Sequence, residues 1–158
     1  MKTGKARIQF AALPYRRRAN AILEVMLITS RDTGRWVIPK GWQGTGLAGQ
    51  DSAEREAREE GGLVGRMGKR PIGQYRYIKK LSDGSSVPCS VEVFTLEVER
   101  QLKSWPERKE RDTRWFELKK AAAAVDEPEL AAMIRNLPRH LAPSIQPART
   151  LRRSVTAA

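Results

Sequence analysis

The chain of 158 residues contains only one cysteine, Cys89, and one histidine, His140. A single cysteine excludes a disulfide bond within the chain, and it favours a reducing compartment with the thiol packed in the core. His140 lies two residues after Pro138, and we interpret it as an exposed residue at a helix end, not as a ligand or a base. Neither residue is therefore a candidate functional group.

Long apolar runs are also absent. Residues 1–18, MKTGKARIQFAALPYRRR, lack the run of about 7–15 apolar residues that marks a signal peptide. No stretch approaches the roughly 20 apolar residues that cross a bilayer. We therefore expect a soluble, cytoplasmic protein with no membrane partner.

The length fits one domain, because 158 residues are enough to bury a hydrophobic core. We place this domain at residues 1–140. Residues 141–158 contain two prolines and three arginines but no acid, and we expect them to form a basic, flexible C-terminal tail.

The formal net charge is +12, and it is distributed unevenly. Residues 1–40 hold nine lysines and arginines but only two acids, Glu24 and Asp32, whereas residues 51–60 hold five acids and two arginines. Basic walls that face an acidic segment suit a polyanionic ligand bridged by a metal ion. For any single lysine or arginine, a solvated surface position is the better explanation.

The acidic segment predicts a helix over residues 51–60. Asp51 is the expected N-cap, with Glu54 three residues later in a capping-box pattern. The pair Gly61 and Gly62 is expected to end the helix.

Three glutamates, Glu56, Glu59 and Glu60, stand three and four positions apart, so they project from one face of this helix. Like charges at these spacings weaken a helix by roughly a few tenths of a kcal/mol per pair, so we expect a cation beside them. Oxygen ligands without cysteine or histidine suit a hard divalent ion, Mg²⁺, with Mn²⁺ as the alternative. The small residues Ala53 and Ala57 would let the helix lie close against a sheet.

The segment Arg55–Leu63, REAREEGGL, resembles the REUXEEXGU core of the Nudix family motif, and Gly41 matches the glycine that opens GX5EX7REUXEEXGU. The first glutamate of that motif is replaced here by Leu47. The resemblance covers about residues 6–138. The flanking segments WVIPKGW and TRWFEL are most similar to the branch that hydrolyses diphosphoinositol polyphosphates and diadenosine polyphosphates.

The resemblance implies an α/β fold, the Nudix α/β/α sandwich, in which a mixed β-sheet lies between the motif helix and the C-terminal helices. It also implies Mg²⁺-dependent hydrolysis of a phosphoric anhydride bond by an attacking water. Under this resemblance Glu56 and Glu60 are metal ligands, and Glu59 is a ligand or the general base. Arg55 orients the acids, and it is expected to pair with Glu59 four residues later.

The resemblance also assigns a further metal ligand to the backbone carbonyl of Lys40 or Gly41, in the glycine-rich loop 40–50. Phosphate contacts are predicted for basic residues near this loop, because guanidinium and ammonium groups bind phosphate. The candidates for binding substrate are Lys40, Arg31, Arg35 and Gly41, with Arg7 and Arg17 as weaker ones. The expected partner is an anionic small molecule that contains phosphate.

The other elements follow from apolar periodicity and turn residues. Strands are predicted at residues 6–13, ending before Pro14, and at 21–29, 35–39, 65–80, 91–99 and 114–118, with a turn at Asp83-Gly84. Helices are predicted at 119–125 and 127–140, the second packing on the sheet through Leu130, Met133, Ile134 and Leu137.

Two alternatives remain open from the sequence. One is an RNA 5′-end pyrophosphohydrolase or nucleic-acid binder, although the basic stretches lack the interleaved aromatic residues of a single-strand platform. The other is a binding domain that has lost catalysis, suggested by Leu47. Glu107 and Glu110 lie where relatives sometimes carry a further acid, and we interpret them as part of a solvated charged loop. The group attached to the phosphates is not specified.

Overall fold

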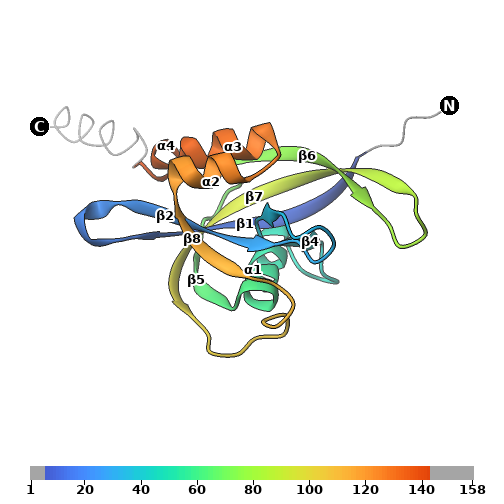
Figure 1. Cartoon of the computed structure of the whole chain (residues 1–158), viewed down its shortest axis with the longest axis horizontal. Coiled ribbons are helices and arrows are strands. Elements are labelled where there is room, and N and C mark those ends of the chain that lie inside the picture. Colours follow the sequence, from blue (N-terminus) through green and yellow to red (C-terminus); the bar gives the residue numbers. More distant parts are fainter. Residues whose placement is uncertain (1–5, 143–158) are drawn as a thin grey trace, which may run out of the picture.

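The computed structural model describes residues 6–142, which form a mixed sheet between two helical layers. Figure 1 shows the helix α1 (Gly49–Gly61) on one side of the sheet and the C-terminal helices on the other. This arrangement confirms the predicted α/β/α sandwich. Residues 143–158, which include most of the predicted tail, lie outside the described residues.

The centre of the sheet is the parallel pair formed by β1 (Arg7–Arg17) and β7 (Ser86–Gln101). The sheet has eight strands in the order β3-β2-β1-β7-β5, with β4 paired to β1, β6 to β7 and β8 to β2. The remaining strands on the β1 side are β2 (Leu23–Thr29), β3 (Trp36–Val37), β4 (Lys40–Trp42) and β8 (Thr113–Glu117). A short 3-10 helix, η1 (Ala19–Ala21), lies between β1 and β2.

The first strand continues through Pro14, so the prediction that it ends there is wrong. β1 pairs with β4 over Gln9–Ala11 and with β2 over Tyr15–Arg17. Pro14 lies between these two segments, where β1 changes its antiparallel neighbour. A proline lacks an N–H, and at this point the missing donor interrupts neither ladder.

The predicted single strand at 65–80 is two strands, β5 (Leu63–Met67) and β6 (Gly73–Lys80). Both pair antiparallel with β7, β6 with its first part and β5 with its last part. Residues 68–72 interrupt them, with the N–H of Gly68 bonded to Thr95 and that of Ile72 to Val93. Pro71 offers no ladder donor within this interruption.

The helix α1 begins two residues before the prediction, with Ala48 as N-cap and no side-chain cap, so the assignment of Asp51 as N-cap is wrong. Asp51 instead places its charge in the first turn, where the helix dipole favours an acid. Ala53 and Ala57 are fully buried against the sheet, as predicted. Gly62 ends the helix in the left-handed conformation, with φ +68°.

The opposite layer contains α2 (Leu118–Ala124), α3 (Pro128–Arg135) and α4 (Leu137–Leu141). The predicted helix 127–140 is therefore divided at Asn136, two residues before Pro138, which cannot donate to a preceding turn. The predicted packing residues of this layer are all buried: Leu130, Met133, Ile134 and Leu137. Within residues 6–142, no helix combines the length and apolar character needed to cross a membrane.

Gly62, at the end of α1, packs closely against the segment between β7 and β8 (residues 102–112, the β7–β8 segment), because a β-carbon on Gly62 would collide with the ring of Trp105. Gly62→Ala is therefore expected to lose about 2 kcal/mol or more of unfolding free energy, from backbone strain plus the collision. Gly34→Ala is the matched control: its φ is +73°, but no atom lies within 4 Å of the added carbon. The control should lose only about 1 kcal/mol. Equal losses in urea unfolding would contradict the predicted role of Trp105.

Candidate active site

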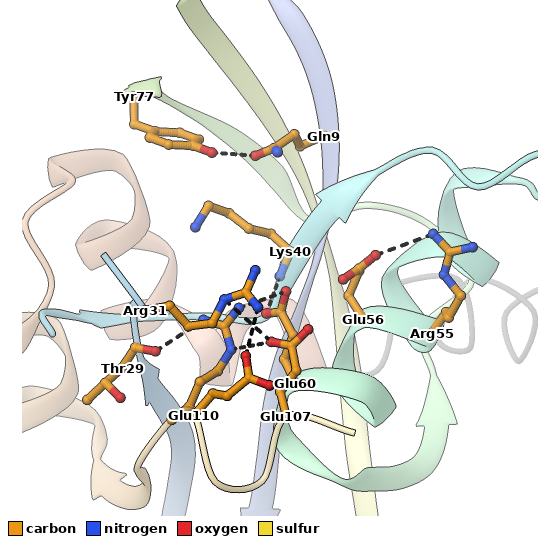
Figure 2. Close-up of polar contacts among 11 residues, drawn as sticks. Gln9, Thr29, Arg31, Lys40, Arg55, Glu56, Glu60, Tyr77, Glu107 and Glu110 are labelled. Carbon is orange, nitrogen blue, oxygen red and sulfur yellow. Dashed lines mark hydrogen bonds and ion pairs between the residues drawn. The ribbon is translucent and has the colours of Figure 1, made fainter. Parts of the chain in front are cut away.

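A cavity of about 330 Å³ opens beside the start of β4. Its lining comes from β1, β3, β4, β6, α1, the turn after β2, the loop after β4 and the segment between β7 and β8. Figure 2 shows Lys40 between two groups of side chains in this region. Tyr77 and Gln9 lie on one side of it, and a group of arginines and glutamates lies on the other.

Glu56 lies against the backbone of β4. Its carboxylate occupies the space that a β-carbon on Gly41 would need. Glycine at position 41 therefore allows the carboxylate of Glu56 to approach the backbone of β4 closely. Burial raises the pKa of Glu56, and hydrogen bonds with Glu60 and Arg55 oppose this effect.

Glu60 is buried, and it is held from two sides. One carboxylate oxygen accepts the backbone N–H of Lys40 at 3.3 Å, and the other lies 3.4 Å from the guanidinium of Arg111. Burial raises the pKa of Glu60, while the charges of Arg111 and Lys40 act in the opposite direction. A buried carboxyl group of this kind is stabilised in its ionised form by a nearby cation.

Glu59 points elsewhere. Its side chain is 43% exposed and does not line the cavity, although its backbone carbonyl accepts the N–H of Glu107. The guanidinium of Arg55 contacts two of the acids, at 3.4 Å from a carboxylate oxygen of Glu56 and 3.9 Å from one of Glu59. The predicted pairing of Arg55 with Glu59 is present. The role of Glu59 as ligand or base stays a prediction, and its position makes Glu56 and Glu60 the better placed acids.

The predicted phosphate contacts divide into two groups. Lys40 lines the cavity, its ammonium lies 4.9 Å from the centre of the Tyr77 ring, and burial lowers its pKa. Arg31 also lines the cavity, but it already contacts Glu110 at 2.8 Å. Arg35 does not line the cavity, because it is drawn to Glu127 at the start of α3, at 2.9 Å.

Arg35 is therefore not among the residues that line this cavity, and its contact with phosphate stays a prediction. The weaker candidates Arg7 and Arg17 are exposed residues of β1 that do not line the cavity either.

Sequence reasoning missed Glu107 and Arg111, which the β7–β8 segment carries into the cavity. Glu107 contacts Arg111 at 2.7 Å, so the interpretation of Glu107 as a solvated loop residue is wrong. Glu110 is exposed, in agreement with that interpretation, although it pairs with Arg31. Two signals were available, the further acid that relatives sometimes carry near Glu107 and the spacing of Glu107 and Arg111 by four residues. The mixed charges of the surrounding segment favoured the interpretation as a solvated loop.

The opposite end of the cavity is basic and aromatic. Tyr77 donates a hydrogen bond to Gln9 at 2.6 Å, and Trp42, 38% exposed, stands beside them. Lys79 completes this end. Within residues 6–142 neither Lys40 nor Lys79 forms an ion pair with an acid.

The donor set fits a hard divalent cation. Among the described residues, no three acidic, histidine or cysteine side chains already form a ligand cluster. Three of the four carboxylates that line the cavity, those of Glu56, Glu60 and Glu107, nevertheless share it with the backbone of Lys40 and Gly41. Carboxylate and carbonyl oxygens are the ligands that Mg²⁺ and Mn²⁺ prefer. Glu56, Glu60 and Glu107 would hold such an ion together with waters.

A profile of the NUDIX domain family matches residues 6–137. The chain belongs to the NUDIX family. Over 102 residues it is 35% identical to Nudix hydrolase 12, mitochondrial, of Arabidopsis thaliana, a match that covers 63% of this chain and 50% of that protein. The chain thus spans about half the length of the curated relatives that it matches.

Solved structures share the fold of this Nudix domain at low sequence identity. The Ap4A hydrolase of C. elegans is 19% identical with a TM-score of 0.63, over 87% of this chain and 100% of the other. The NUDIX domain of Shewanella oneidensis NrtR, complexed with ADP ribose, is 13% identical with a TM-score of 0.65, over 88% of this chain and 90% of the other.

Leu47, which replaces the first glutamate of the Nudix motif, is half-buried and does not line the cavity. It packs over Gly44 beside the guanidinium of Arg55. We therefore expect Leu47→Glu to change kcat by less than about tenfold, or ~1.4 kcal/mol. Leu47→Gln, similar in shape but uncharged, is the control. Activity that appears only in the glutamate variant would indicate a domain that has lost catalysis.

The raised pKa of Glu60 predicts a pH-dependent stability. At pH values between 4.5, the ordinary pKa of this carboxyl group, and its raised pKa of about 8, Glu60 keeps a proton in the folded metal-free protein that it has released in the unfolded chain. The contribution of Glu60 to stability is therefore present at low pH and is lost as pH rises through this window. The unfolding free energy of wild type minus that of Glu60→Gln, measured in chelator, should fall as the pH is raised from about 4 towards 7. A difference that rises or stays constant would contradict this.

Proposed function

We propose that this Nudix domain hydrolyses a phosphoric anhydride bond in a nucleotide-linked polyphosphate, of the dinucleoside polyphosphate kind, with Mg²⁺ as cofactor and Mn²⁺ as a substitute. The observation that carries the proposal is the division of one cavity into an acidic end and a basic, aromatic end. The acidic end holds Glu56, Glu60 and Glu107, and the basic end holds Lys40 and Lys79. Support also comes from the names of two fold neighbours, an Ap4A hydrolase and a domain complexed with ADP ribose.

The chemistry needs a water to attack phosphorus while the bridging P–O bond breaks, giving two phosphate products and one proton. A bound divalent cation would neutralise phosphate charge and lower the pKa of the attacking water. Glu56 and Glu60 would hold that cation, and Arg55 would keep Glu56 in place. A carboxylate at the acidic end of the cavity would accept the released proton.

The basic end would bind the rest of the substrate. Lys40 and Lys79 form no direct ion pair with an acid of the described part, although the charge of Glu60 acts on Lys40, so both lysines would be available to phosphate groups. Trp42 and Tyr77 offer aromatic surface beside them. A planar base fits such a surface better than a sugar alcohol does, because aromatic rings stack on it. This favours a nucleotide over a diphosphoinositol polyphosphate.

The test is hydrolysis of dinucleoside polyphosphates, ADP ribose, nucleotide sugars, diphosphoinositol polyphosphates and 5′-triphosphorylated RNA, each with Mg²⁺ and with chelator. We expect cation-dependent cleavage of the dinucleotide class. Glu56→Gln and Glu60→Gln should each lower kcat about a hundredfold or more, since both remove a charge that supports the cation. Glu54→Gln, an exposed acid on the same helix, is the matched control and should retain activity.

Other outcomes assign other functions. Cleavage of RNA alone would identify the pyrophosphohydrolase of RNA ends. Binding of nucleotides without cleavage by wild type would identify a binding domain. Full turnover in chelator, with the cation shown to be absent, would exclude the metal-dependent mechanism.

A further inference from the structure

Arg111 occupies the acidic end of the cavity, where the proposed cation would lie. Its side chain is only 9% exposed, and each edge of the guanidinium has a partner. Nε lies 2.7 Å from Glu107, Nη2 lies 3.4 Å from Glu60, and Nη1 donates to the backbone carbonyl of Thr29 at 3.1 Å. The fork shape of arginine allows these three contacts at once, which an ammonium cannot do.

The negative charges at the acidic end are thus compensated by arginines of the same chain. Glu56 contacts Arg55, and both Glu60 and Glu107 contact Arg111. The described lining of the cavity holds five basic and four acidic residues, and Leu47 stands where the family motif has one more acid. A free divalent cation would enter an acidic end whose carboxylates are already paired with arginines, and it would meet Arg111 at close range.

We propose that Arg111 is the resident counter-cation of Glu60 and Glu107, so that a divalent cation binds tightly only when phosphate groups arrive with it. A cation–phosphate complex brings its own negative charge, and Arg111 then attracts it. Arg111 acts through the two carboxylates and is in this sense a positioning residue. The inference rests on the proposed function for the identity of the site.

A purely structural role would have different consequences. Arg111 also ties the β7–β8 segment to β2 and α1, so its loss could simply loosen the site and weaken every ligand. As a counter-cation, in contrast, its loss removes the positive charge that repels an entering cation beside Glu60 and Glu107, while the backbone N–H of Lys40 still holds Glu60. The two roles therefore predict opposite changes in cation affinity.

The experiment is calorimetric titration of the whole chain with Mn²⁺, without any phosphate. Arg111→Gln should bind Mn²⁺ about tenfold more tightly than wild type, because a nearby positive charge is removed. The same variant should bind the preformed Mn²⁺ complex of a non-hydrolysable methylene nucleoside diphosphate about fivefold more weakly or worse. Arg108→Gln makes the same charge change on the same segment, at an exposed residue outside the cavity lining, and should alter neither affinity.

Arg111→Lys keeps the charge without the fork, and it tests the proposal even where Arg111→Gln does not fold. The lysine variant should keep both affinities within about threefold of wild type, since the charge remains. Unchanged or weakened Mn²⁺ binding in a folded Arg111→Gln would overturn the proposal, as would a tenfold change of Mn²⁺ affinity in Arg111→Lys.

These measurements are independent of turnover. If wild type cleaves its substrate but Arg111→Gln gains no Mn²⁺ affinity, the role of Arg111 is wrong and the proposed function stands. If no substrate is cleaved and Arg111→Gln still gains Mn²⁺ affinity, the proposed function fails alone.

Discussion

The site depends on how closely α1 packs against the sheet. Ala53 and Ala57 present no atoms beyond the β-carbon, so the helix backbone can lie near the strands. This packing brings Glu60 into a buried position and sets Glu56 against Gly41. Burying carboxylates is costly unless positive charge or hydrogen bonds compensate them. The arrangement of arginines around the site follows from that requirement.

The loop after β4 is held by the same helix. The backbone N–H of Gly44 donates to the buried hydroxyl of Ser52 at 2.9 Å. On the other side, the β7–β8 segment is held by the end of α1, where the N–H of Glu107 bonds to Glu59 and that of Leu102 to Gly62. One helix therefore positions both walls of the acidic end. Movement of α1 would displace all of its carboxylates together.

The distribution of charge within the cavity distinguishes this domain from a merely basic surface. The net charge of +12 suggests a general attraction for polyanions. In the structure all three arginines that line the cavity form ion pairs with acids, whereas Lys40 and Lys79 form none within the described residues, so specific attraction is concentrated at one end. A linear polyphosphate matches this polarity, with its reacting phosphates at the acidic end and its remaining charge on the lysines.

Local features of the fold could be predicted because they depend on residues near one another in the chain. The helix face with Glu56 and Glu60 follows from spacing, the end of α1 from Gly62, and the β6–β7 turn from Asp83-Gly84. The errors also have local causes. Asp51 and Pro14 carry strong intrinsic preferences, but contacts made elsewhere in the chain set where α1 begins and which ladder β1 joins.

The sequence by itself determined the Nudix motif, the predicted metal ligands on one helix and the layer that packs on the sheet, because each is a periodic pattern. Tertiary structure decided which charges meet. It turned Glu59 outward, paired Arg35 with Glu127, and brought Glu107 and Arg111 from a distant segment to Glu60. Charge runs in loops carry no periodicity that marks a buried face. Their partners are set only by where β7 and β8, each paired with other strands, hold the ends of the segment, and by the space beside α1.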